Sequence, residues 1–153
     1  MALPYERAEI QTWSRYLANS YRHWRNQDLV TIKNGKTVAL SLFEAPCAIV
    51  SHGTQTDPIF NYANRCALKL WEMDWDIFTQ LPSRLSAEPM HREERANMLA
   101  QLDTQGFVDD YQGIRISSQG KRFYIKQATI WNVIDDTGNS IGQAATFQNW
   151  TFL

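Results

Sequence analysis

Apolar and polar positions change their spacing along this chain of 153 residues, and each change marks a predicted element. In residues 4–25 the apolar side chains recur at intervals of three and four residues, which is the pattern of an amphipathic helix. Residues 47–51 and 59–62 are short apolar segments on either side of a turn that contains Asp57-Pro58. They predict two strands, of which the first is apolar on both faces and therefore central in a sheet.

Short helices follow these strands, and each begins at a residue that can cap it. The side chains of Asn64 and Asp74 can accept hydrogen bonds from the free amides of a first helical turn. A longer helix follows Pro89 and ends at Gly106, a residue type that suits a helix C-terminus. This order of elements, completed by the strands below, predicts an α+β fold with its helices on one face of an antiparallel sheet.

The C-terminal third of the chain predicts strands joined by hairpin turns. Residues 107–116, 121–134 and 140–152 are rich in β-branched and aromatic residues, and Gly-containing turns separate them. A chain of this length fits one domain. We expect residues 1–44 to form an N-terminal helical extension, or lid, and residues 45–153 to form a single globular unit.

Charge and composition exclude some partners. The 15 basic and 16 acidic residues give a net charge of −1 without a basic stripe, so nucleic acid is not an expected partner. The N-terminus is charged where a signal peptide needs an apolar run, and no segment could span a bilayer. We therefore expect a cytoplasmic protein without a membrane partner, in which Cys47 and Cys66 are buried free thiols.

Catalytic and metal-binding patterns are weak. Ser51, His52 and Asp57 have the residue types of a hydrolytic triad, but adjacent residues of a strand point to opposite faces. No spacing of Cys, His or carboxylates matches a metal site. We predict no catalytic residue and no metal ligand, and an enzyme is the most remote of the functional alternatives.

The apolar stripe of the first helix must be covered by something. One alternative is packing on its own domain, and the other is packing on a partner helix, since large aromatic patches tend to mark interfaces. Both stay open from the sequence. The second predicts a homodimer whose interface contains Trp13, Leu17, Tyr21 and Trp24.

Four short motifs resemble a known family. They are Ser-His-Gly-Thr at 51–54, Asp-Pro-Ile-Phe-Asn-Tyr-Ala-Asn at 57–64, Pro-Ser-Arg-Leu-Ser-Ala-Glu-Pro at 82–89, and Arg-Glu-Glu-Arg at 92–95. From about Tyr21 to the C-terminus the chain resembles a PAS domain, and more closely the PAS-related MEKHLA domain family. The resemblance implies a five-stranded antiparallel sheet, helices around a central pocket, and a sensory or regulatory role. It also implies a role in dimerisation, as at the C-termini of plant transcription factors.

The resemblance disfavours flavin. Light-sensing PAS domains carry a motif Asn-Cys-Arg-Phe-Leu-Gln, to which residues 82–87 correspond, with Arg84 at the arginine and Ser83 in place of the reactive cysteine. A hydroxyl is a far poorer nucleophile than a thiol, so covalent flavin photochemistry is not expected. On the same alignment, positions that usually offer amides to the flavin ring are Ile125 and Phe147.

Haem is disfavoured as well. His91 begins the last helix, where haem-binding PAS domains place an axial ligand, but a lone histidine at such a position is usually exposed. The identity of a cofactor or ligand therefore stays open.

The strand at 121–134 supplies the predicted pocket. If Ile125 points into a pocket, period-two alternation places Gln127, Thr129 and Trp131 on the same face. A buried Gln127 either bonds a neighbouring side chain or water, or orients a ligand. The predicted ligand-binding residues are Tyr62, Arg84, Ile125, Gln127, Thr129, Trp131 and Phe147.

Three functional hypotheses follow. The first is a sensory module that binds a small molecule in a central pocket and signals through dimerisation. The second is an interaction module that dimerises without a ligand. The third is a small enzyme on a PAS-like scaffold, which would need a general base beside a polarising donor. We expect the first.

Overall fold

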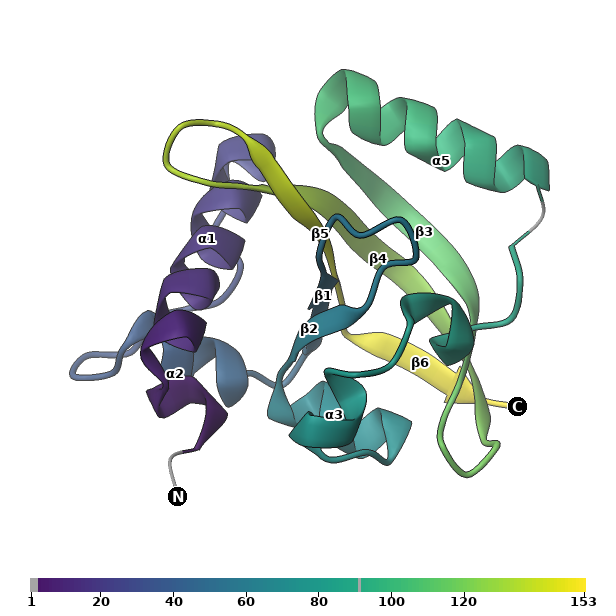
Figure 1. Ribbon diagram of the computed structural model, residues 1–153, viewed down its shortest axis with the longest axis horizontal. Coiled ribbons are helices and arrows are strands. Elements are labelled where there is room, and N and C mark those ends of the chain that lie inside the picture. Colours follow the sequence, from purple (N-terminus) through teal and green to yellow (C-terminus); the bar gives the residue numbers. More distant parts are fainter. Residues whose placement is uncertain (1–2, 91) are drawn as a thin grey trace.

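A central antiparallel sheet with helices on both sides forms the core of the computed structural model, which describes residues 3–90 and 92–153 (Figure 1). The helical elements are η1 (Pro4–Glu6), α1 (Ala8–Arg25), α2 (Val38–Phe43), α3 (Arg65–Trp71), α4 (Trp75–Phe78), η2 (Ser83–Ser86) and α5 (Arg92–Gln105). The strands are β1 (Ala48–His52), β2 (Phe60–Ala63), β3 (Phe107–Ile116), β4 (Arg122–Ile134), β5 (Ser140–Phe147) and β6 (Asn149–Phe152). None of the helices in the described ranges is both long and apolar enough to cross a membrane.

The short helices α2, α3 and α4 begin at capping residues, as predicted for Asn64 and Asp74. The side chains of Thr37, Asn64 and Asp74 each accept a hydrogen bond from the backbone amide three residues later, at 3.1, 3.1 and 2.8 Å. Asn64 is fully buried, and it also accepts from the amide of Ile49 at 3.0 Å and donates to the carbonyl of Cys47 at 2.7 Å. Its amide therefore joins the start of α3 to β1, an inner strand of the sheet.

The strand order is β2-β1-β5-β4-β3, and every neighbouring pair is antiparallel. The sixth strand, β6, pairs with the first half of β4, while β5 pairs with its second half. Only Gln148 separates β5 from β6, so the predicted strand at 140–152 is one strand with a break. The predicted α+β, PAS-like fold with a five-stranded antiparallel sheet and an N-terminal helix is confirmed.

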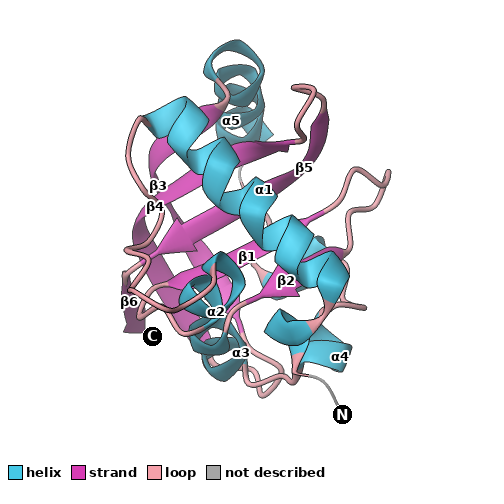
Figure 2. Cartoon of the chain, turned by 90° about the vertical axis from the view of Figure 1, so that its left-hand side faces the viewer, coloured by secondary structure: helices cyan, strands magenta, loops and turns pink. Residues whose placement is uncertain are grey.

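Helix α1 crosses the strands on one face of the sheet (Figure 2). The indole Nε1 of Trp13 donates to Ser51 Oγ at 2.8 Å, and that of Trp24 donates to the carbonyl of Asn132 at 2.8 Å. Gly106, at φ 84°, leaves no room for a Cβ beneath the Trp24 ring. Both tryptophans thus bind the chain's own sheet.

The other two residues of the α1 stripe, Leu17 and Tyr21, also pack on the chain's own sheet. Leu17 is fully buried, and Tyr21 packs edge-on against Trp131 with ring centroids 5.0 Å apart. Of the two alternatives for this stripe, packing on the domain's own sheet is therefore correct. The four residues predicted for a dimer interface make their contacts within one chain, and the homodimer itself stays a prediction.

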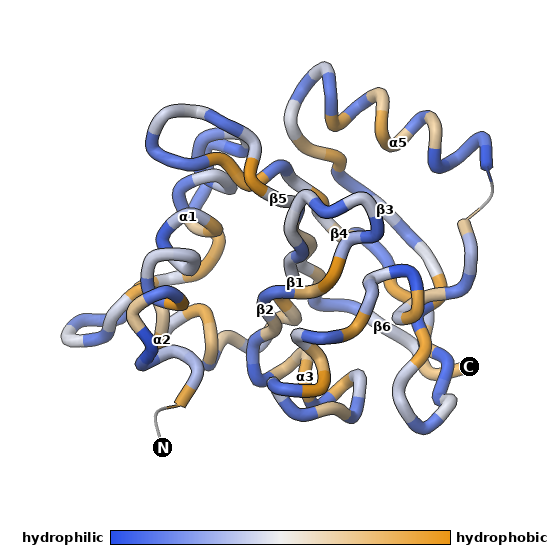
Figure 3. The backbone as a smooth tube through the Cα atoms, in the orientation of Figure 1, coloured by the Kyte–Doolittle hydropathy of each residue, from blue (hydrophilic) through white to orange (hydrophobic). Residues whose placement is uncertain are grey.

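The opposite face of the sheet carries α3, α4, η2 and α5, and it is covered unevenly. Trp71 packs against the strand residues Phe123 and Phe147, and Phe78 stacks on Phe60 of β2. Helix α5 buries only Leu102, and hydrophilic and hydrophobic positions alternate along its length (Figure 3). This face is therefore closed near α3 and loosely covered near α5.

Strand β4 changes faces at Gln127, which has a left-handed φ of 54°. Ile125 and Ala128 both pack on the α3 side, with two residues between them instead of one. Such an extra residue is a β-bulge, and it inverts the alternation beyond it. The prediction that Ile125, Gln127, Thr129 and Trp131 share a face is therefore wrong.

Candidate ligand-binding cavity

A cavity of about 340 Å³ lies between the sheet and the segment from α3 to α5. This volume is at the lower end of the roughly 300–1,000 Å³ that small-molecule sites occupy. Its interior is mainly apolar, and the apolar side chains come from four strands, α3, α5 and the segment before α5. They are Val50, Phe60, Trp71, Met90, Met98, Ile125, Ile130, Ala145 and Phe147.

Charged side chains gather on one part of the cavity wall. Arg84 is exposed, and its Nε lies 3.2 Å from a carboxylate oxygen of Asp57. Glu88 forms an ion pair with Arg122, which holds the pKa of the Glu88 carboxyl below its usual value. Arg115, on β3, is half-buried. Arginine therefore outnumbers carboxylate on the cavity wall.

Backbone pairing fixes Arg115 at this position. It forms an isolated β-bridge with Ala87, and the amide of Glu88 donates to the carbonyl of Ile114 at 3.0 Å. The Arg115 guanidinium lies over the ring of Tyr111, 5.6 Å from its centroid, and Nη2 donates to the Tyr111 hydroxyl at 3.4 Å. The segment after η2 is thus tied to β3 at the residue that carries the charge.

Trp71 forms the floor of the cavity and is held from two sides. Its indole Nε1 donates to the carbonyl of Ser86 at 3.2 Å, which ties α3 to η2. Its ring packs edge-on against Phe123, with the centroids 5.2 Å apart. Its carbonyl accepts from the amide of Ser118 at 3.0 Å. The floor is therefore rigid in comparison with the α5 wall.

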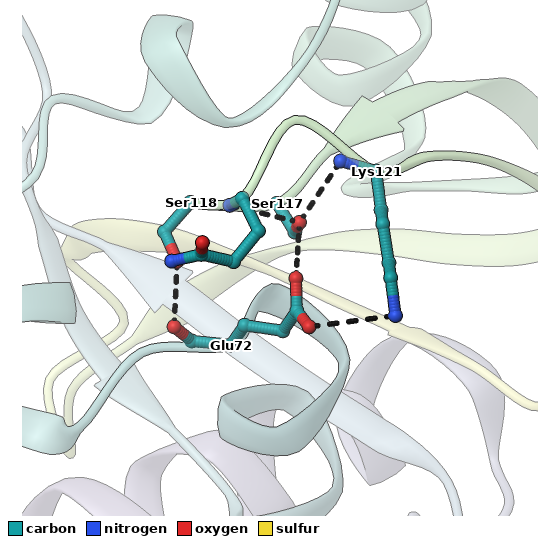
Figure 4. Close-up of polar contacts among 5 residues, drawn as sticks. Glu72, Ser117, Ser118 and Lys121 are labelled. Atoms are coloured by element: carbon teal, nitrogen blue, oxygen red, sulfur yellow. Dashed lines mark hydrogen bonds and ion pairs between the residues drawn. The ribbon is translucent and has the colours of Figure 1, made fainter.

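The end of α3 is fastened to the β3–β4 hairpin around Glu72 (Figure 4). Glu72 has a left-handed φ of 57°, which ends the helix. Its carboxylate accepts from the Ser117 hydroxyl at 2.7 Å and pairs with Lys121 at 3.6 Å, and its carbonyl accepts from the Ser118 hydroxyl at 2.7 Å. These contacts fix the position at which Trp71 enters the cavity wall.

His52 is a neutral group on the cavity wall at pH 7. Burial lowers its pKa, the hydrogen bond to the carbonyl of Gly53 acts in the opposite direction, and the positive charge of Arg115 lowers it further. Nδ1 lies 2.8 Å from that carbonyl, and because a carbonyl can only accept, Nδ1 carries the proton. The charge of Arg115 therefore acts directly on the cavity.

The family model described as the MEKHLA domain matches residues 11–152 of this chain. The chain belongs to the MEKHLA domain family. This confirms the resemblance seen in the four sequence motifs.

Among curated proteins, this MEKHLA domain is similar to the homeobox-leucine zipper protein ATHB-9 of Arabidopsis thaliana. The two are 26% identical over 151 residues, which are 95% of this chain and 18% of the relative. It is also 25% identical over 150 residues to HOX29 of Oryza sativa subsp. indica, covering 95% of this chain and 17% of the relative. The chain spans less than a fifth of the length of these relatives.

Among solved structures, the chain is similar to the PAS domain of a protein from Colwellia psychrerythraea. The TM-score is 0.61 at 13% identity, over 75% of this chain and 92% of the other. A second similar structure is the photo-excited blue-light photoreceptor Vivid, with a TM-score of 0.57 at 17% identity over 87% of this chain and 93% of the other. At these identities the likeness shows the fold alone.

Three of the seven predicted ligand-binding residues lie on the cavity wall of the MEKHLA domain: Arg84, Ile125 and Phe147. Gln127 is exposed, and its side-chain oxygen accepts from Asn149 Nδ2 at 3.1 Å. Its predicted place in the pocket is therefore wrong, because the bulge at Gln127 turns it outward.

The other three predicted residues lie on the α1 face. Trp131 and Tyr62 belong to the core beneath α1. Thr129 donates to Asp109 Oδ1 at 3.1 Å, and Asp109 forms an ion pair with Arg25 of α1. The prediction of Thr129 and Trp131 as pocket residues is wrong for the same reason as that of Gln127. The prediction of Tyr62 is wrong because the register of β2 shifts between Phe60 and Tyr62, so that Phe60 packs on the cavity side and Tyr62 in the core beneath α1.

Sequence reasoning missed the polar groups of β3 and α5. Tyr111, Gly113 and Arg115 alternate with their neighbours, and the two side chains at 111 and 115 both reach the cavity wall. That alternation could have been read from the sequence. The exposed Arg95 of α5 could not, because its place at the cavity depends on how α5 folds back over the sheet.

The hydrolytic triad, the metal site and the haem ligand considered from the sequence can be compared with the described side chains. Ser51 Oγ donates to Asn61 Oδ1 at 2.6 Å and accepts from Trp13, whereas His52 Nδ1 bonds the carbonyl of Gly53, so the two form no triad. Within residues 3–90 and 92–153 no group of three or more Cys, His, Asp or Glu could hold a metal ion. His91, considered above as a haem ligand, lies outside the described residues.

The cavity does not fit covalent flavin chemistry. Ser83 lies on its wall, and neither Cys47 nor Cys66 is among the residues described there. Burial raises the pKa of both thiols, so both are poor nucleophiles at neutral pH. Ile125 and Phe147 present hydrocarbon where a flavin ring would need amides.

Proposed function

We propose that this MEKHLA domain is a sensory module that binds a small molecule in the 340 Å³ cavity and passes its occupancy through the sheet to α1. One observation carries the proposal: the same strands form a cavity wall on one face and the α1 docking surface on the other. Apolar walls with a few polar groups are typical of small-molecule sites. A ligand on one side of the sheet can therefore act on a helix at the other side.

Strand β1 provides the shortest connection. Val50 and His52 lie on the cavity wall, while the side chain of Ser51 accepts the hydrogen bond from Trp13 of α1. Because adjacent strand residues point to opposite faces, a small shift of β1 changes both surfaces at once. The cavity and α1 are thus separated by one layer of backbone.

Strand β5 also connects the cavity to α1, and it is closely packed against both β1 and Trp13. Gly142 lies against the backbone carbonyl of His52, and a Cβ at Gly142 would lie 3.2 Å from the Trp13 ring. Two residues further along β5, Ala144 belongs to the core beneath α1, and Ala145 lies on the cavity side. Close-packed groups transmit displacement because they cannot absorb it.

Helix α5 can admit a ligand. Leu102 is its only buried residue among those described, and Leu99 is 39% exposed. Helices with few buried contacts open at lower free energy than the core of a domain. Arg95 and Met98 of this helix line the cavity, so movement of α5 would widen it.

Native mass spectrometry of the full chain in the presence of a small-molecule mixture tests this proposal. We expect the chain to bind one or more compounds, and Ala145→Met to lose them, because the longer side chain fills the cavity from β5. The control is Ala18→Met on α1, since residue 18 is partly buried away from the cavity. If the wild-type chain binds no compound, or if Ala145→Met binds the same compounds equally, the proposal is wrong.

A further inference from the structure

The cavity of this domain combines an apolar interior with unbalanced positive charge. Four charged side chains that bear on its ligand chemistry are Arg84, Glu88, Arg95 and Arg115. Arg84 is paired with Asp57 and Glu88 with Arg122, so these two side chains already have partners of opposite charge. In the described part of the chain, no carboxylate forms an ion pair with Arg95 or Arg115.

Arg115 is the more informative of these two residues. It is half-buried, and its one side-chain hydrogen bond among the described residues, to the Tyr111 hydroxyl, is long at 3.4 Å. A guanidinium has five N–H donors in a planar fork that matches the two oxygens of a carboxylate or the oxygens of a phosphate. Most donors of Arg115 are thus available to a group inside the cavity.

Resting on the proposed function, we infer that the ligand is an amphipathic acid whose anionic group binds Arg115 and Arg95 and whose apolar body fills the cavity. The body would contact Val50, Ile125, Ile130 and Phe147. The anion supplies the charge that the wall lacks. A neutral apolar ligand would fill the same space and leave both guanidinium groups without a partner of opposite charge.

The two arginines come from different layers of the molecule. Arg115 is on β3, where its bridge to Ala87 fixes the backbone, and Arg95 is on α5, the loosely packed wall. An anion between them joins α5 to the sheet through charge-assisted hydrogen bonds, which are about twice as strong as neutral ones. The anionic group therefore selects the ligand and also closes the cavity over it.

His52 gives this inference a second readout. The positive charge of Arg115 contributes to the lowered pKa of His52. An anion bound to Arg115 offsets that charge and raises the His52 pKa, whereas a neutral ligand of the same shape does not. The sign of the change separates the two kinds of ligand.

The experiment compares octanoate with octanol by isothermal titration calorimetry and ¹H–¹⁵N NMR spectra of the full chain at pH 7.5, and the His52 ring resonances are then followed from about pH 8 to about pH 5. Octyl phosphate forms a third arm, which separates a carboxylate from a phosphate as the preferred anion. We expect octanoate or octyl phosphate to bind about tenfold more tightly than octanol. Shifts should centre on Ile125, Ile130 and Phe147, and the His52 pKa should rise only with the two acids.

Arg115→Gln should remove most of this preference and leave the affinity for octanol unchanged, which also shows that the variant folds. Arg95→Gln, at an exposed position, should lower the affinity for the acids two- to threefold, since exposed pairs contribute less. Arg22→Gln on α1 is the matched control, because Arg22 is exposed and pairs with Asp28 away from the cavity.

The possible failures are distinguishable. Equal affinity for octanol and the two acids, or a preference for acids that survives both Arg115→Gln and Arg95→Gln, overturns the anionic ligand and leaves the proposed function standing. If no probe shifts the resonances of the cavity residues, both the inference and the proposed function are wrong.

Discussion

The same strands form both faces of the sheet, but the side chains pack more closely on one face than on the other. Beneath α1 the side chains of Leu17, Trp131 and Val133 have no exposed surface. On the opposite face a cavity remains between the sheet and α5, a 14-residue helix that buries only Leu102. The side chains directly beneath α1 are closely packed, whereas the other face keeps space for a further molecule beneath α5.

This difference in packing shows how a small domain can keep a cavity on one face without losing its stability. Closely packed interiors leave few voids larger than a water molecule. The aromatic residues of α1 supply a large apolar area, and those of α3 and α4 close one end of the second face. The fold can then leave the α5 end open. We expect mutations to reveal this contrast as follows.

The largest effect should come from neighbouring residues of β4 that face opposite ways. Trp131→Ala should lower the free energy of unfolding by about 3–5 kcal/mol, because it removes a fully buried ring beneath α1. Ile130→Ala, at the cavity wall, should cost about 2 kcal/mol, the low end for such a change, because its surroundings are already partly open. Urea unfolding monitored by circular dichroism measures both. Equal losses would show that the two faces are packed alike.

A second pair of neighbours tests the free space directly. Ala144→Met should destabilise the domain by about 1–3 kcal/mol through overpacking beneath α1. Ala145→Met should change the free energy of unfolding by less than about 0.5 kcal/mol, because the cavity accommodates the longer side chain. Thermal and urea unfolding of both variants decide this. A larger loss for Ala145→Met than for Ala144→Met would contradict the assignment of the faces.

Gln127 marks the point at which β4 exchanges faces, and its backbone conformation can be tested separately. A left-handed φ costs an ordinary residue roughly 1 kcal/mol, which glycine avoids. Gln127→Gly should therefore be neutral or stabilising, although it loses the hydrogen bond to Asn149. Gln127→Val should destabilise the domain by roughly 1 kcal/mol or more, because a β-branched residue tolerates this conformation poorly. Since Gln127 is exposed, neither change should affect ligand binding.

The smallest effect concerns pH and the cavity face alone. The pKa of His52 is lowered in the folded state, so below its unfolded pKa of about 6.5 the unfolded chain binds more protons. Stability from this group is present above that pH and declines as the pH falls from about 7 to 5. His52→Gln should reduce this decline. Urea unfolding at pH 7.0 and 5.5 makes the comparison.

Local signals predicted much of the fold. The caps at Asn64 and Asp74, the central position of β1 and the hairpins after Gly106 follow from residue types at short range. The similarity of four motifs then indicated the family correctly. These features depend on neighbours in sequence, which is why the sequence alone determines them.

The residues that line the cavity were harder to predict, because one residue of β4 decides which side chains face the cavity. A bulge at Gln127 carries no glycine or proline signal, yet it moved Thr129 and Trp131 to the α1 face. The partner of the α1 stripe was equally ambiguous, since an apolar stripe does not specify what covers it. Tertiary packing decided both points.

The most direct test of the account follows the Trp13 indole N–H resonance while the cavity is titrated with octanoate. Trp13 donates to Ser51 on the α1 face, and it is not among the residues described on the cavity wall. If ligand occupancy reaches α1 through the sheet, this resonance should shift with the same Kd as those of Ile125 and Ile130. Shifts of the cavity resonances with an unchanged Trp13 indole signal would contradict the account.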